Sequence, residues 1–154
     1  MTPKSLIDAY AYQFSEKAVG IALFKGWFPI FSRLCADVDK ELGDNKRDFF
    51  WVQVKEKFGA ARFYYSMVVD VPSGDQEPGA LTVASKIARL TTNAAFESAK
   101  HCIVCGAPAK IELHRMGGYQ ALCPEHADMV ENRKKLPPFH CNPGDEPEGW
   151  WSYF

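Results

Sequence analysis

Four metal-ligating residues near the C-terminal end constrain this chain more than any other feature of its sequence. Cys102 and Cys105 are separated by two residues, and Cys123 and His126 repeat that spacing after seventeen intervening residues. A two-residue gap lets one short turn present both ligands to the same tetrahedral ion, and this combination lies within the spacing range of structural zinc sites. The sequence therefore predicts one structural Zn²⁺ per chain, bound by these four residues.

A redox-active pair formed by Cys102 and Cys105 is the alternative, because a C-x-x-C pair can cycle between dithiol and disulfide. The chain has five cysteines, an odd number. The redox interpretation leaves Cys123 and His126 without a role, whereas zinc accounts for all four residues.

The residues around the ligands predict a turn and then a β-hairpin. Gly106 permits the left-handed backbone of a turn folded around metal-bound sulfur. Gly117 and Gly118 predict a two-residue turn between two short strands. This turn pairs His114 with Ala121 across the hairpin.

A helix is predicted after the hairpin. Pro124 suits its first turn, Arg133–Lys135 place positive charge at its end, and the prolines that follow Leu136 terminate it. A knuckle, a hairpin and a helix that carries the last two ligands resemble the treble-clef zinc finger. The resemblance covers residues 101–135. It implies a fold and no single function, because treble clefs occur in nucleases, in protein-interaction modules and in ribosomal proteins.

The rest of the chain predicts an α+β body. Residues 1–100 form this body, residues 101–136 the zinc finger, and residues 137–154 an acidic and aromatic tail. The predicted fold class is α+β, with a small helical and β-hairpin body and a C-terminal treble-clef-like zinc finger. Apolar periodicity places the elements of the body at helices of about 6–18, 29–42 and 81–100 and a hairpin of about 49–70.

Particular residues define these elements. Ser5 is the expected N-cap of the first helix. Cys35 falls in the apolar stripe of the second helix, which indicates a small buried hydrophobe and not a fifth ligand. Trp27 either packs at the start of that helix or lies exposed for a partner. Residues 72–79 read as a loop. The third helix leads almost directly into Cys102, so the finger is expected to dock on the body.

Length and composition restrict the class of protein. A chain of 154 residues, 47% of them hydrophobic, can form one core with an appended metal module. It has no apolar run of transmembrane length and no N-terminal basic region followed by an apolar one, so we expect a cytoplasmic protein without a membrane partner. A net charge of −1 and a pI near 6.4 argue against a general nucleic-acid binder.

Two surfaces are candidates for binding. The predicted hairpin interleaves Lys55, Lys57 and Arg62 with aromatic residues, an arrangement that can stack bases and neutralise phosphate. A half-buried sheet with a solvated face explains the same pattern. The tail is the second surface, where aromatic side chains either fold back onto the body or anchor a partner. These aromatic residues are Trp150, Trp151, Tyr153 and Phe154.

The enzymatic alternative is a degenerate HNH-like nuclease, in which a treble-clef-like hairpin and helix hold a catalytic metal. Its pattern needs a hairpin histidine beside an Asp or a second His, and an Asn or His on the helix. Here His114 is flanked by Leu113 and Arg115, and Ala127 follows His126. We therefore expect His114 at the surface or beside the metal ligands, and no DNA cleavage.

A second resemblance spans most of the chain. The segments GWFPIFSRLC, VQVKEKFGAARFYY and CIVCG with ALCPEHA are similar to a group of small proteins found in phages and prophages. Those proteins read closer to QVKEKFGGLRFY, so Ala60 and Ala61 are departures near the hairpin turn. The resemblance assigns no catalytic residue. It implies a phage-type setting, in which small proteins often bind and block a host protein.

Three functional hypotheses follow. The first is a non-enzymatic, zinc-stabilised protein-binding module, such as a phage-encoded inhibitor of a host defence or regulatory protein in the host cytoplasm. The second is a nucleic-acid-binding zinc-finger protein that uses the basic hairpin and Arg133–Lys135. The third is the degenerate nuclease.

Overall fold

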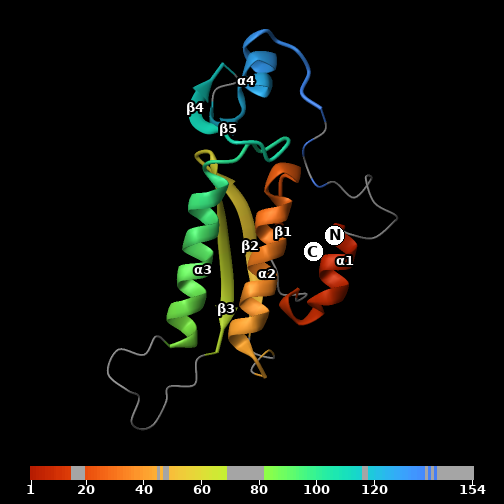
Figure 1. Cartoon of the computed structure of the whole chain (residues 1–154), viewed down its shortest axis with the longest axis vertical. Coiled ribbons are helices and arrows are strands. Elements are labelled where there is room, and N and C mark those ends of the chain that lie inside the picture. The colour runs from red at the N-terminus through yellow and green to blue at the C-terminus, as the bar shows by residue number, and fades with distance from the viewer. Residues whose placement is uncertain are drawn as a thin grey trace.

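A three-stranded sheet with two long helices side by side on one face forms the body of the molecule (Figure 1). The computed structural model describes residues 1–14, 20–44, 46, 49–68, 82–115, 118–137, 139 and 141. The sheet has the order β1-β2-β3, with β1 parallel to β2 and β2 antiparallel to β3. Its strands are β1 (Gly20–Ile21), β2 (Phe49–Lys57) and β3 (Ala60–Met67).

The remaining elements complete an α+β fold, as predicted. Helices α2 (Phe28–Leu42) and α3 (Val83–Ser98) cover the sheet, and α1 (Pro3–Ala9) continues into the short 3₁₀ turn η1 (Ala11–Gln13). A second 3₁₀ turn, η2 (Lys25–Trp27), precedes α2. At one end of the body lie β4 (Lys110–His114), β5 (Gly118–Leu122) and α4 (Pro124–Glu131), which form the C-terminal finger (Figure 1).

Aromatic rings fill the space between α2 and the sheet. Phe31 of α2 stacks on Phe63 with an interplanar angle of 2° and contacts Trp51 at a ring distance of 5.4 Å. Phe49 and Tyr65 extend the cluster along the same face of the sheet. The antiparallel pairing of β2 with β3 confirms the predicted hairpin. Its inward face uses Phe63 and Tyr65, two of the aromatic residues on which the base-stacking hypothesis depends.

One buried polar side chain crosses this apolar core. The Trp51 Nε1–H donates to Oε1 of Gln13 at 3.0 Å, and the amide nitrogen of Gln13 donates to the Cys35 carbonyl at 2.8 Å. Gln13 is fully buried, so these bonds replace the water that it loses. They connect η1, β2 and α2.

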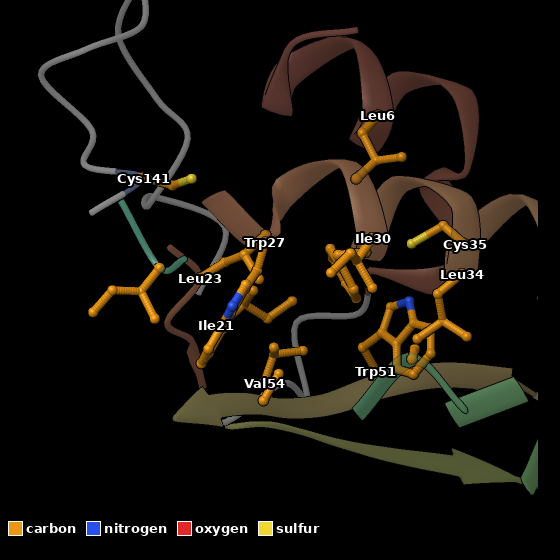
Figure 2. Close-up of a cluster of buried hydrophobic side chains, with 14 of the residues drawn as sticks. Leu6, Ile21, Leu23, Trp27, Ile30, Leu34, Cys35, Trp51, Val54 and Cys141 are labelled. Carbon is orange, nitrogen blue, oxygen red and sulfur yellow. The ribbon is translucent and has the colours of Figure 1, made fainter. Parts of the chain in front are cut away.

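The second helix agrees with the prediction in extent and in its buried face. Cys35 is fully buried with Leu34 and Trp51 nearby (Figure 2), and burial raises the pKa of its thiol far above the ordinary value. Its expected role as a small buried hydrophobe is confirmed. Trp27 is 1% exposed. It therefore packs in the core, and the alternative of an exposed side chain that contacts a partner is wrong.

The first helix differs from the prediction. It begins at Pro3 and not near residue 6, because Thr2 is the N-cap: its hydroxyl accepts the Ser5 amide, and the Ser5 hydroxyl accepts the Thr2 amide. Ser5 thus occupies the third helical position and is not the cap. The helix ends at Ala9, where the prediction extends it to about residue 18; residues 15–19 lie outside the described part of the chain.

The third helix is shorter than predicted by about one turn in total. Its buried residues are Ile87, Thr91, Ala94 and Ser98. The Ser98 hydroxyl accepts the Ala61 amide at 2.8 Å and fixes the end of the helix on β3. The predicted loop at 72–79 lies outside the described residues.

None of the described helices has the length and apolar character needed to cross a membrane.

Backbone contacts attach the finger to the body at Gly26. The Gly26 amide donates to the Ile103 carbonyl at 3.0 Å, and the neighbouring Trp27 Nε1–H donates to the His101 carbonyl at 2.9 Å. A Cβ atom at position 26 would overlap the Cys102 carbonyl oxygen and lie 2.7 Å from the Gly106 nitrogen. Only glycine allows this approach.

We predict that Gly26→Ala destabilises the protein by about 3 kcal/mol, since the obstructing atoms are backbone and cannot move aside cheaply. Urea unfolding followed by circular dichroism measures the effect. Gly118→Ala is the matched control, because a Cβ at position 118 has nothing within 4 Å. Equal stability of the two variants would contradict the assigned contact.

Candidate metal centre

The four predicted ligands converge at the base of the finger. Cys102 and Cys105 lie in the turn that follows α3, Cys123 caps the N-terminus of α4, and His126 lies in its first turn. One donor atom from each residue falls within a group whose members are all within 4.8 Å of one another. No other group of this kind occurs among the described residues.

The spacing between donor atoms fits a tetrahedral zinc ion. With Zn–S bonds near 2.3 Å and a Zn–N bond near 2.05 Å, tetrahedral angles place two sulfurs about 3.8 Å apart and a sulfur and a nitrogen about 3.5 Å apart. Cys105 Sγ and Cys123 Sγ are separated by 3.8 Å. Nδ1 of His126 lies 3.5 Å from Cys102 Sγ and 3.1 Å from Cys123 Sγ.

The backbone of the first turn is formed as the sequence predicts. Gly106 has a φ of 76°, in the left-handed region, and its amide donates to the Cys102 carbonyl at 2.9 Å. The Cys102 amide in turn donates to the Ala107 carbonyl at 2.8 Å. These bonds hold both sulfurs on one side of the turn, which is the arrangement of a zinc knuckle.

The local environment sets different protonation tendencies for the two knuckle thiols. Burial by itself raises the pKa of the Cys102 thiol. Hydrogen bonds from the backbone, of which that of Cys123 has the largest effect, outweigh burial, so the pKa lies below its ordinary value. Burial raises the pKa of Cys105 to about 11, and the neighbouring sulfurs of Cys102 and Cys123 add to the increase. A cation bound among the three sulfurs compensates their negative charge and releases their protons.

A hairpin and then a helix follow the first ligand pair, as predicted, but the hairpin register differs from the prediction. His114 pairs with Gly118, and Ala121 pairs with Ile111. The predicted two-residue turn at Gly117 and Gly118 is therefore wrong, because Gly118 belongs to β5 and the connection consists of residues 115–117.

The structure contradicts one of the two positions expected for His114. The side chain is 4% exposed and lies between β4 and α4, where its Nδ1 is 3.6 Å from the Glu131 carboxylate. The expected surface position is therefore wrong, and His114 is not one of the four residues of the ligand cluster. Its Nε2 is buried and has no hydrogen-bond partner among the described residues.

The basic residues of the hairpin share one face of the sheet. Lys55 pairs with Arg62 across β2 and β3, and the Lys55 ammonium lies 5.0 Å from the centre of the Tyr64 ring. Lys57 is exposed near the hairpin tip. The carboxylate of Glu56 accepts the Gly59 amide at 2.7 Å. The aromatic tail residues Trp150, Trp151, Tyr153 and Phe154 lie outside the described residues.

One surface was not identified from the sequence. Leu113 and Tyr119 pair directly across the finger hairpin and are 64% and 52% exposed. Ile111 shares their face, and Gly59 of the neighbouring hairpin lies against its side chain. Phe58, which precedes Gly59 in the chain, is 75% exposed. We call Phe58, Ile111, Leu113 and Tyr119 the apolar patch.

Comparisons with known proteins identify no relative. No protein-family model matches the chain, and neither the curated proteins nor the solved structures searched contain a match. The relation to phage and prophage proteins consequently remains an expectation from the sequence resemblance. The candidate metal centre is supported by the geometry of its own residues.

We predict about one zinc per chain, bound by three sulfurs and one nitrogen. Elemental analysis and X-ray absorption at the zinc edge measure the amount and the ligand set. Cys102→Ser should lose the metal and unfold the finger, because metal binding supplies on the order of 10 kcal/mol to folding in such modules. Cys35→Ala, which removes a thiol outside the cluster, should retain it. Equal zinc content in the two variants would rule out the assigned site.

Proposed function

We propose that this protein is a non-enzymatic, zinc-stabilised protein-binding module. Four protein ligands complete a tetrahedral zinc sphere and leave no position for a substrate or an activated water, which favours a structural metal. The apolar patch carries the proposal, because it places four large exposed side chains on the surface of the finger and the adjacent hairpin tip.

The composition of the patch suits a protein partner. Phenylalanine and tyrosine are enriched at the centres of protein interfaces, and contiguous exposed apolar surface is uncommon on a chain that has no partner. Phe58 comes from the body, whereas Ile111, Leu113 and Tyr119 come from the finger. Zinc therefore supports binding indirectly, by holding two separate hairpins in one surface.

The resemblance to phage and prophage proteins suggests the setting. We propose that the partner is a host protein, that it is met in the cytoplasm of a bacterial cell, and that binding blocks it. The acidic and aromatic tail, residues 137–154, is a second candidate contact for the same partner.

We predict that Leu113→Ser combined with Tyr119→Ser reduces capture of the partner more than about tenfold, since central interface residues contribute most of the binding energy. Affinity capture from a bacterial lysate by the zinc-loaded protein, with quantitative mass spectrometry, measures the loss. Phe96→Ser is the matched control, because Phe96 is 67% exposed on α3 and lies outside the patch.

The outcomes separate the two candidate contacts. A partner that is lost from the patch variant and kept by Phe96→Ser supports the patch. A partner that is kept by the patch variant and lost when residues 145–154 are removed assigns binding to the tail instead. Absence of any partner that distinguishes these proteins rejects the proposal.

Binding of single-stranded nucleic acid is a second proposal, favoured by the common face of Lys55, Arg62 and Tyr64. Aromatic residues beside cations are typical of single-strand binding surfaces. Because the Glu56 carboxylate accepts a backbone amide in the hairpin turn, it is held in the turn and does not pair with these cations. The near-neutral net charge of the chain makes this candidate weaker than the first.

If Lys55, Lys57 and Arg62 each neutralise one phosphate, the logarithm of the binding constant should fall with the logarithm of salt concentration with a slope of about −2. Fluorescence anisotropy with a labelled single-stranded oligonucleotide measures the slope. Lys55→Gln should make it shallower, whereas Lys4→Gln, a change on α1, should leave it unaltered. A binding constant that is independent of salt excludes this candidate.

A further inference from the structure

A basic hollow lies at the C-terminal end of α4. Its volume is about 340 Å³. It is lined by Arg115, which follows β4, by Val130 in the last turn of α4, and by Arg133 and Lys134, which follow that helix. Three of these four lining residues are cations. The hollow shares no residue with the apolar patch, so its ligand is independent of the partner proposed above.

The cations of the hollow are available to an external anion. Neither Arg115 nor Arg133 forms a side-chain ion pair with any carboxylate of the described residues. The Lys134 ammonium is 3.9 Å from the Asp128 carboxylate, with both side chains more than 60% exposed, an arrangement that contributes little. Glu131 is the remaining nearby acid, and its carboxylate lies 3.4 Å from the Arg115 amide and 3.6 Å from Nδ1 of His114.

The backbone at Arg133 gives a second reason to assign a role to its side chain. The residue has a φ of 56°, in the left-handed region that glycine or asparagine normally occupies after a helix. The Arg133 amide donates to the Val130 carbonyl and the Lys134 amide to the Met129 carbonyl, so this conformation closes the helix end. Glycine would fit here without strain, and arginine brings a guanidinium to the hollow at a conformational cost.

A buried atom without a partner lies on the adjacent residue. The His114 side chain is buried, with 4% of its surface exposed, and its Nε2 forms no hydrogen bond with any described residue. A buried ring nitrogen in this state is usually paired with bound water or a ligand. His114 precedes Arg115 in the chain but does not line the hollow. Its ring nitrogen is therefore a separate feature, and a ligand is indicated by the three lining cations and by the Arg133 backbone.

We propose that this hollow binds a phosphate group, carried either by free phosphate or by a larger phosphate-bearing molecule. Arginine presents planar, paired N–H donors that match phosphate oxygens, and lysine adds a point charge. The volume is at the small end of the range for ligand sites, which suits a phosphate with little attached to it. Arg133 and Lys134, at the C-terminal end of α4, also interact favourably with the helix dipole. The experiment below separates this structural role from ligand binding.

The test is a titration of the zinc-loaded, ¹⁵N-labelled protein with inorganic phosphate at constant ionic strength, with chloride as the balancing anion. We expect saturable shifts in the amide signals of Arg115 and of residues 130–134. Arg133→Gly should weaken phosphate binding roughly tenfold through loss of a charge-assisted contact. Its melting temperature should not fall, because glycine is the residue that this backbone conformation favours.

Lys135→Gln is the matched control, since it removes one exposed charge from the same segment without altering the lining of the hollow. Unchanged phosphate affinity in this control, together with the loss in Arg133→Gly, supports the site. Equal weakening in both variants, or the absence of saturable shifts across the millimolar range, overturns it. A lower melting temperature of Arg133→Gly with unaltered phosphate affinity also overturns it and assigns Arg133 to the helix end alone.

A second arm distinguishes the sources of phosphate. Phosphoserine and a short single-stranded oligonucleotide replace inorganic phosphate in the same titration. Tighter binding of the oligonucleotide, lost in Arg133→Gly, identifies a nucleic-acid backbone as the carrier. Equal or tighter binding of the monoester identifies a small ligand. Oligonucleotide binding that Arg133→Gly leaves unchanged belongs to another surface and counts against the hollow.

Discussion

The approach of Gly26 to the ligand-bearing turn is the contact on which the rest of the structure depends. Backbone meets backbone there, because a glycine faces the Cys102 carbonyl and its amide bonds to Ile103. The four candidate metal ligands lie together within the finger, and this contact attaches their turn to the body. Without it, the position of the finger relative to the body would depend on fewer contacts, chiefly the Trp27–His101 hydrogen bond and the approach of Gly59 to Ile111.

Features that depend on local spacing could be predicted from the sequence. The ligand set follows from two C-x2 pairs, the left-handed turn from Gly106, and the buried face of α2 from its apolar periodicity. Each of these involves residues within a few positions of one another, or a metal whose ligand spacing is well known. The N-cap at Thr2 is an exception at short range, because either Thr2 or Ser5 can begin a helix and the position of Pro3 decides between them.

Features that depend on distant partners could not be predicted. Gln13 looks like an ordinary polar residue until Trp51 and the Cys35 carbonyl are placed beside it. The finger hairpin shows how a small local error spreads. Two adjacent glycines are compatible with more than one turn, and the observed register differs from the predicted one by an odd number of residues. An odd shift changes which side chains share a face, so the pairing of Leu113 with Tyr119, and with it the apolar patch, was not visible in the sequence.

The contact between Gly59 and Ile111 makes the chemistry of the surface conditional on the metal. Phe58 belongs to the β2–β3 hairpin, while Ile111, Leu113 and Tyr119 belong to the finger that carries the candidate metal site. If the finger needs a bound metal to fold, removal of the metal would separate Phe58 from these three residues without changing any residue of the patch. The availability of this surface would then follow the metal supply of the cell, and the protein would present a complete face only where zinc is present to assemble it.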